Sequence, residues 1–200
     1  MLPRMRTLID GGLTSDGVIP ATLARDVRVV GVAGHRSFAD AAAGAFVERA
    51  CRRVLARLAQ TAPDCVALSP LAEGADTAFA EAALDAGLTL DVVRPYRGFG
   101  DDFATAAARA RYRRLLRAAR GRHELAFGYA CEDAFEAAMN HVVDGCDLLV
   151  VAWDGGPPAG RGGTAHAVRR AVALDRTWLH LDTRSRTQHL HRGRRAGGCR

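Results

Sequence analysis

The chain alternates between short apolar runs and longer stretches in which apolar residues recur at helical spacing. The apolar runs are rich in Val, Leu and Ala, and several end at or just before Gly, Ser or Pro. This pattern is typical of buried parallel strands. The runs lie at residues 28–34, 65–69, 88–93, 147–153 and 177–181, with a weaker one at 124–127.

Helical spacing fills the intervals between these runs. After Ser37–Asp40, which resembles a helix N-cap, one face carries Phe46, Ala50, Val54 and Leu58. Further helices are expected at residues 76–85, 101–120, 132–143 and 164–174. Strand and helix alternate about six times, which predicts an α/β fold: a single doubly wound Rossmann-like domain with a mainly parallel sheet.

In such a sheet, right-handed crossovers bring every strand-to-helix loop to one edge, where ligands bind near the switch in strand order. We therefore take the glycines and polar residues that follow the strands as candidate binding residues. They are Gly34, His35, Arg36, Ser37, Gly74, Asp76, Thr77, Gly162, Gly163, Thr164 and His166.

Two of these loops, those containing Gly74 and Gly162–Thr164, open a helix with Gly just before it. Unpaired backbone N–H groups and the positive end of the helix dipole suit a phosphate at such a position. Arg36 and Arg161 could neutralise its charge, while Tyr96 and Trp153 could stack on a base. In the alternative interpretation the glycines only make turns, Thr164 is an N-cap and Asp76 caps its own helix. Neither loop matches GxGxxG or GxxxxGK[ST].

Composition and charge change this picture little. The chain has 200 residues, 48% of them hydrophobic and 25% charged, as in an ordinary globular protein. The net charge of +6 arises from six Arg between 184 and 200, because the remaining 22 Arg balance 22 acidic residues. We therefore expect a loosely ordered lead-in at 1–24, a domain at 25–183 and a basic, disordered tail at 184–200. The absence of Lys excludes Schiff-base and P-loop lysine chemistry.

Location and cofactors follow from what the sequence lacks. No apolar run approaches the length of a membrane span, and the N-terminal residues lack the apolar region of a signal peptide. The five Cys are scattered and form no CxxC pair, which favours reduced thiols in a cytoplasmic protein. Cys51, Cys65 and Cys146 lie among apolar residues and are expected in the core. No cofactor or metal is expected.

Four segments together resemble the SLOG superfamily, the Rossmann-like group that contains the Smf/DprA and LOG proteins. They begin at Gly31, Leu71, Asp147 and Gly160 and read GVAGHR, LAEGADT, DLLVVAWDG and GRGGTA. The resemblance covers roughly residues 27–181. It implies binding of a nucleotide or nucleotide-derived ligand, with the phosphate held by the Gly74 and Gly162–Thr164 loops.

Members of the LOG branch of the superfamily cleave nucleoside monophosphates. Their sequences contain a loop similar to PGGxGTxxE, and a catalytic Arg lies on the preceding helix. Here no carboxylate follows Thr164 in the first turn, where His166 lies instead, and no Arg occurs between His123 and Gly160. N-glycoside cleavage needs an anion to stabilise positive charge or to activate water. Glu73 and Asp154 are the spare carboxylates at the same edge that could take this catalytic role.

We therefore predict a protein that binds a nucleotide-derived phosphate ligand at the carboxyl edge of the sheet, as a sensor or ligand-binding protein. The alternative is an enzyme that cleaves or transfers an N-glycosidic bond through Glu73 or Asp154. The expected partner is a small molecule. Nucleic acid is expected to bind only through the basic tail, no membrane partner is expected, and homo-oligomerisation is left open.

Overall fold

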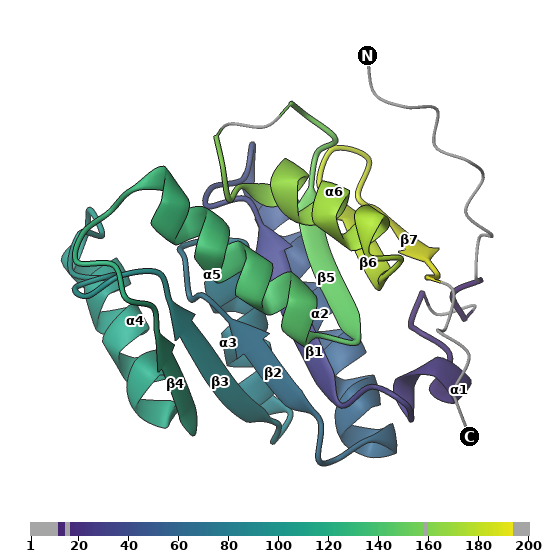
Figure 1. The fold of residues 1–200 in the computed structure, drawn as a ribbon. Helices are drawn as coiled ribbons and strands as arrows, with labels where there is room; N and C mark the ends of the chain where they lie inside the picture. Colours follow the sequence, from purple (N-terminus) through teal and green to yellow (C-terminus); the bar gives the residue numbers. More distant parts are fainter. Residues whose placement is uncertain (1–11, 15–16, 158–159, 194–200) are drawn as a thin grey trace.

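The computed structural model describes residues 12–14, 17–157 and 160–193. Seven strands form one sheet in the order β4-β3-β2-β1-β5-β6-β7 (Figure 1). The strands are β1 (Val29–Gly34), β2 (Val66–Ser69), β3 (Thr89–Arg94), β4 (Gly121–Glu124), β5 (Leu148–Trp153), β6 (Thr177–Asp182) and β7 (Thr187–His191). The helices are α1 (Ala21–Ala24), α2 (Ala41–Thr61), α3 (Ala75–Asp85), α4 (Ala106–Ala118), α5 (Glu132–Gly145) and α6 (Thr164–Ala173).

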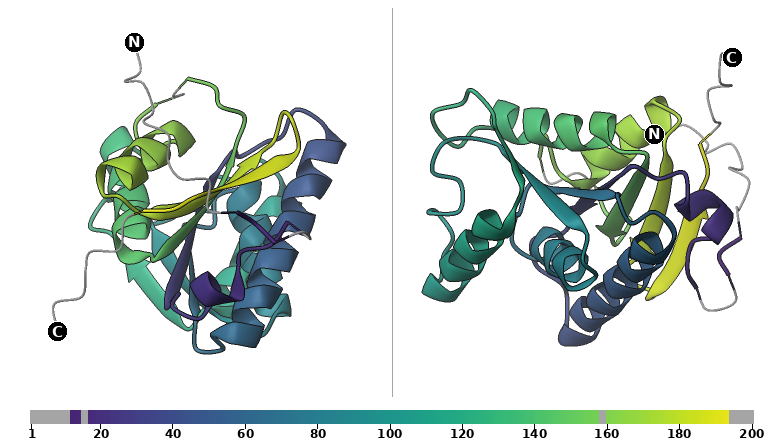
Figure 2. Two further views of the ribbon diagram at one scale, coloured as in Figure 1. Left: turned by 90° about the vertical axis from the view of Figure 1, so that its right-hand side faces the viewer. Right: turned by 90° about the horizontal axis from the view of Figure 1, so that it is seen from below.

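Helices cover both faces of the sheet. Helices α5 and α6 lie on one face, and α2, α3 and α4 lie on the other, as the view from below shows most clearly (Figure 2). Each face has its own apolar core. One core joins Phe46, Leu55 and Phe79 to the sheet, and the other joins Val142 and Val168 to the opposite side of the strands. The predicted α/β Rossmann-like architecture is confirmed.

The strand order reverses between β1 and β5. From β1 the chain moves outward through β2, β3 and β4, then returns to place β5 on the other side of β1. Strands β1 to β6 pair in parallel, and β7 alone runs antiparallel to its neighbour β6. The loops after β1 and β5 therefore meet at the switch point, which is the usual ligand position in this architecture.

Two elements differ from the prediction by more than two residues at a boundary. Helix α4 begins after Thr105, whose hydroxyl oxygen accepts from the Ala108 amide, and not at Asp101. The weak strand lies at Gly121–Glu124, earlier than the predicted 124–127. It is an edge strand with exposed side chains at three of its four positions, so it carries no apolar run that would mark its position.

The C-terminal segment contributes to the fold, contrary to our expectation of a disordered tail from residue 184. The Asp182 carboxylate accepts from the amides of Arg184 and Ser185, which makes a tight turn. Strand β7 then pairs with β6, and Leu190 is buried in the core. One apolar residue among polar ones is a weak strand signal. The strand forms because its backbone pairs with that of β6. Residues 194–200 lie outside the described residues.

The N-terminal lead-in also departs from the expected loose order. Val18 and Ile19 are buried in the core, and Pro20 precedes the short helix α1. Their burial in the same core as α2 makes residues 18–24 part of the domain. Residues 1–11 and 15–16 lie outside the described residues.

None of the helices among the described residues is long and apolar enough to cross a membrane.

The predicted core cysteines Cys51, Cys65 and Cys146 are buried, and burial raises the pKa of the Cys51 and Cys146 thiols to about 12. These two thiols are therefore protonated at neutral pH, and they pack as small apolar side chains.

Candidate functional site

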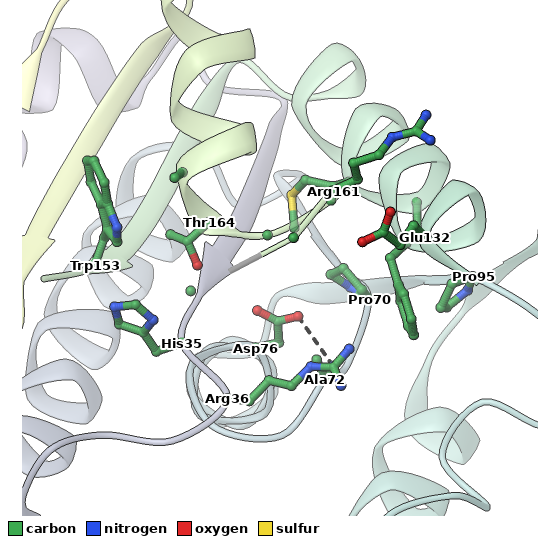
Figure 3. Close-up of a pocket in the computed structure, with 18 of the residues that line it drawn as sticks. His35, Arg36, Pro70, Ala72, Asp76, Pro95, Glu132, Trp153, Arg161 and Thr164 are labelled. Carbon is green, nitrogen blue, oxygen red and sulfur yellow. Dashed lines mark hydrogen bonds between the residues drawn. The ribbon is translucent and has the colours of Figure 1, made fainter. Parts of the chain in front are cut away.

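A cavity of about 510 Å³ opens at the carboxyl edge of the sheet, over the switch point between β1 and β5 (Figure 3). We call it the edge cavity. Its volume lies in the range of about 300–1,000 Å³ that small-molecule sites occupy. Of the predicted binding residues, those that line it are Gly34, His35, Arg36, Asp76, Gly162, Gly163 and Thr164.

One wall of the edge cavity is the start of α6. Gly163 is the N-cap residue, and the amides of Thr164 and Ala165 have no hydrogen-bond partner among the described residues. Gly162 has a φ of +77°, and a Cβ there would lie 2.4 Å from the backbone carbonyl carbon of Phe135 on α5. Gly162 thus lets the loop pack directly on α5, which leaves the free amides facing the cavity.

The opposite wall forms where the end of β1 meets the start of α3. A Cβ at Gly74 would lie 2.4 Å from the His35 carbonyl oxygen, and one at Gly34 would lie 2.4 Å from the Ala75 Cβ. The Ala75 amide donates to the His35 carbonyl oxygen at 3.1 Å. Only glycine permits these approaches, which bring His35 and Arg36 beside the first turn of α3.

The two arginines predicted to neutralise a phosphate have different surroundings. Arg161 forms ion pairs with α5: its Nη1 lies 2.8 Å from Asp133 Oδ1, and its Nε donates to Glu136 Oε2 at 2.6 Å. Arg36 forms no ion pair within the described part of the chain, and its Cζ lies 5.1 Å from the centroid of the Phe135 ring. Of these two arginines, Arg36 is therefore the one available to pair with an anionic ligand in the cavity.

Asp154 holds the imidazole ring of His35 in place. Its Nε2 lies 3.0 Å from Asp154 Oδ1, and the same carboxylate accepts from the Gly156 amide at 2.9 Å. The Gly156 bond and then His35 keep the pKa of Asp154 below its ordinary value. Asp154 is thus an anion that orients His35, and it is not one of the residues that line the edge cavity.

Asp76 lies at the floor of the cavity and is almost completely buried. Burial raises the pKa of its carboxyl to about 7, while a hydrogen bond from the Ala72 amide and the nearby charge of Arg36 act in the opposite direction. Gly74 holds the N-cap position and no side-chain hydrogen bond caps α3, so the alternative interpretation, in which Asp76 caps its own helix, is wrong.

Several predicted residues lie near the edge cavity without lining it. The Thr77 hydroxyl donates to the Gly74 carbonyl oxygen, and His166 Nε2 lies 3.0 Å from Asn140 Oδ1 on α5. Those that do not line it are Ser37, Glu73, Gly74, Thr77, Asp154 and His166. Of the two predicted stacking residues, Trp153 lines the cavity, whereas Tyr96 is buried with its ring edge-on against Phe99 and Phe135.

Sequence reasoning missed the contribution of α5. Glu132, Phe135 and Met139 line the edge cavity from this helix, and Pro95 and Phe99 line it from the loop after β3. Glu132 has the sequence signature of an ordinary helix N-terminal acid, and Phe135 and Met139 have that of a core stripe. Phe135 and Met139 lie four positions apart and therefore share a face of α5, and the position of α5 over the switch point decides that this face meets the cavity.

The comparisons with known proteins concern the fold. No family model and no curated protein matches the sequence. Among solved structures, DNA processing protein A (DprA) from Streptococcus pneumoniae aligns with a TM-score of 0.55 and 21% identity, over 78% of this chain and 51% of that chain. DprA from Helicobacter pylori aligns with a TM-score of 0.55 and 18% identity, over 80% of this chain and 67% of that chain.

The molybdenum cofactor carrier protein of Chlamydomonas reinhardtii aligns with a TM-score of 0.47 and 17% identity, over 76% of this chain and 75% of that chain. The chain spans about half of the length of the Streptococcus pneumoniae protein. It shares with DprA a Rossmann-like α/β fold. The resemblance found in the sequence is thereby confirmed at the level of the fold.

Proposed function

We propose that the chain binds the phosphate of a nucleotide-derived ligand in the edge cavity. The observation that carries this proposal is the start of α6, where Thr164 and Ala165 line the cavity at the switch point and their amides have no hydrogen-bond partner among the described residues. Converging amides at a helix N-terminus stabilise an anion through hydrogen bonds and through the helix dipole. Arg36 lines the same cavity and adds a positive charge, which also acts on the nearby carboxyl of Asp76.

The remaining walls suit a nucleoside. Pro70, Pro95 and Phe135 present apolar surface at the cavity, and Trp153 lines it at the end of β5. A ligand with a flat aromatic base, whose face packs on apolar surface, and an anionic phosphate would satisfy both kinds of wall. This composition favours a nucleotide over inorganic phosphate as the ligand.

Gly163→Asp tests the proposal. The residue has a φ of −78°, and a Cβ there would lie 3.5 Å from the nearest described atom, so the fold accommodates the side chain. Asp is also a favourable N-cap. Its carboxylate would nevertheless occupy the amides and repel a phosphate, so we expect the melting temperature of the ligand-free protein to be kept and its increase with ligand to be lost.

The measurement is a thermal-shift screen of the full chain with the four 5′-ribonucleoside monophosphates, cyclic nucleotides, sugar phosphates, inorganic phosphate and a single-stranded DNA oligonucleotide. Gly163→Ala is the matched control and should keep the response, because it adds a methyl group without a charge. An equal response in Gly163→Asp and wild type would show that the anion does not bind at α6.

N-glycoside cleavage through Glu73 or Asp154 stays a prediction that the geometry does not favour. Neither carboxylate lines the edge cavity, and Asp154 is engaged by His35 and Gly156. Release of free base from nucleoside monophosphates by the wild type, lost in Glu73→Gln, would restore this hypothesis.

A further inference from the structure

Asp76 presents an unsatisfied hydrogen-bond acceptor to the edge cavity. Asp76 is only 3% exposed to solvent. Oδ2 accepts from the Ala72 amide at 3.3 Å, whereas Oδ1 is buried and has no partner among the described residues. Buried polar atoms are almost always hydrogen-bonded, and leaving one without a partner costs free energy. The carboxyl lines the cavity and points into it (Figure 3), so a bound molecule could satisfy it.

The loop before α3 is built around this carboxyl. The buried Ser69 hydroxyl accepts from the Leu71 amide at 3.0 Å and donates to the Asp76 carbonyl oxygen at 3.3 Å. Leu71 has a φ of +60°, an unfavourable backbone conformation for a leucine. Such a conformation persists only where its surroundings enforce it. The loop therefore holds Asp76 in one position before any ligand arrives.

The position of Asp76 indicates which part of a nucleotide it meets. In the view of Figure 3, Asp76 lies between Thr164, at the start of α6, and the apolar rings of Pro70 and Pro95. In a nucleotide the ribose lies between phosphate and base. A phosphate at α6 and a base against the apolar wall therefore bring the ribose to Asp76.

We propose that Asp76 Oδ1 accepts a hydrogen bond from a ribose hydroxyl of the bound nucleotide, so that the edge cavity selects ribonucleotides over deoxyribonucleotides. This inference rests on the proposed function and adds to it the recognition of the sugar. A hydroxyl that donates to a charged acceptor contributes about 10- to 100-fold in affinity. A deoxyribose leaves Oδ1 buried without a partner in the complex.

The test compares ribo- and deoxyribonucleotides at pH 8, where Asp76 is mostly ionised because its pKa is about 7. Calorimetric titration of the full chain uses the four 5′-ribonucleoside monophosphates, their 2′-deoxy and 3′-deoxy counterparts, and inorganic phosphate. We expect the ribonucleotide that binds most tightly to exceed at least one of its deoxy counterparts by about 10- to 100-fold.

Asp76→Ala should remove this ratio, because the variant has no carboxyl oxygen to accept from the ribose. Asp76→Asn keeps an acceptor oxygen and should keep part of the ratio. Asp85→Ala is the control, since it removes an acid at the other end of α3, and its ratio should equal that of the wild type.

The possible results separate the two proposals. Equal wild-type affinities for ribo- and deoxyribonucleotides would overturn the role of Asp76 and leave phosphate binding intact. A ratio that persists in Asp76→Ala would also overturn it. No binding of any probe by the wild type would overturn both proposals. The wild-type comparison needs no variant, so the outcome does not depend on how Asp76→Ala folds.

Discussion

Asp76 and Asp154 are two acids at one edge of the sheet with opposite electrostatics. Asp154 accepts hydrogen bonds from an amide and from His35, which lower its pKa, whereas burial raises that of Asp76 to about 7. The sequence analysis considered Asp76 as a binding residue or a helix cap and Asp154 as a spare carboxylate, but it predicted no difference in their ionisation. The difference depends on which neighbours surround each carboxyl, and those neighbours come from distant parts of the chain.

The raised pKa of Asp76 predicts a pH-dependent stability. The native state binds this proton more tightly than the unfolded chain does, so the free energy of unfolding falls as pH rises from about 4 to about 7. Asp76→Asn removes this loss, so its advantage over the wild type should grow from less than about 2 kcal/mol at pH 5 to as much as about 4 kcal/mol at pH 8.

Urea unfolding of both proteins at the two pH values measures this difference. Asp85→Asn serves as a control at the exposed end of the same helix, where no such pH-dependent gain is expected. A difference between wild type and Asp76→Asn that is the same at pH 5 and pH 8 would contradict the prediction.

At the scale of elements, glycines decide how closely the loops approach their neighbours. The pattern of the sequence predicted the strands, the helices and the two glycine-rich helix starts. It could not indicate that Gly162 contacts the backbone of α5, because this contact joins residues far apart in sequence. For the same reason α5, whose Phe135 and Met139 line the edge cavity, was absent from the predicted site.

Gly162 and Gly155 provide a matched pair that isolates this contact. Both have a positive φ, +77° and +79°, but no described atom lies within 4 Å of a Cβ at Gly155. Gly155→Ala should cost only the backbone strain of about 1 kcal/mol. Gly162→Ala must in addition displace the loop from α5, so we expect at least about twice that cost and a lost thermal response to nucleotide.

Chemical unfolding and the thermal-shift screen measure the two effects separately. Equal stability and equal ligand response in Gly162→Ala and Gly155→Ala would show that the close approach to α5 has no role in holding the site.

At the scale of the molecule, the fold extends beyond the segment that sequence patterning outlined. The net charge of +6 suggested a basic tail from residue 184. Arg184 and Arg186 belong instead to the segment that connects β6 and β7, and β7 completes the sheet beside β6. A truncation meant to remove basic residues without cutting into the sheet therefore has to begin after His191, the last residue of β7.

Leu190→Ala tests whether β7 unfolds together with the rest of the domain. The side chain is buried against the core, so its removal should lower the free energy of unfolding by about 2–5 kcal/mol. Leu174→Ala, at a 45% exposed position, should change it by less than about 0.5 kcal/mol. Similar small effects in both variants, measured by urea unfolding, would mean that β7 is not part of the cooperative unit.

The sequence by itself determined the alternation of strands and helices, the parallel sheet and the edge at which Gly34, Arg36 and Gly163 gather. These features follow from local periodicity and from the handedness of crossovers. Only the tertiary structure decided which side chains line the edge cavity, which residues Arg161 and Asp154 pair with, and that Asp76 Oδ1 has no partner among the described residues. Burial and pairing depend on contacts between segments far apart in the chain, which local patterns do not encode.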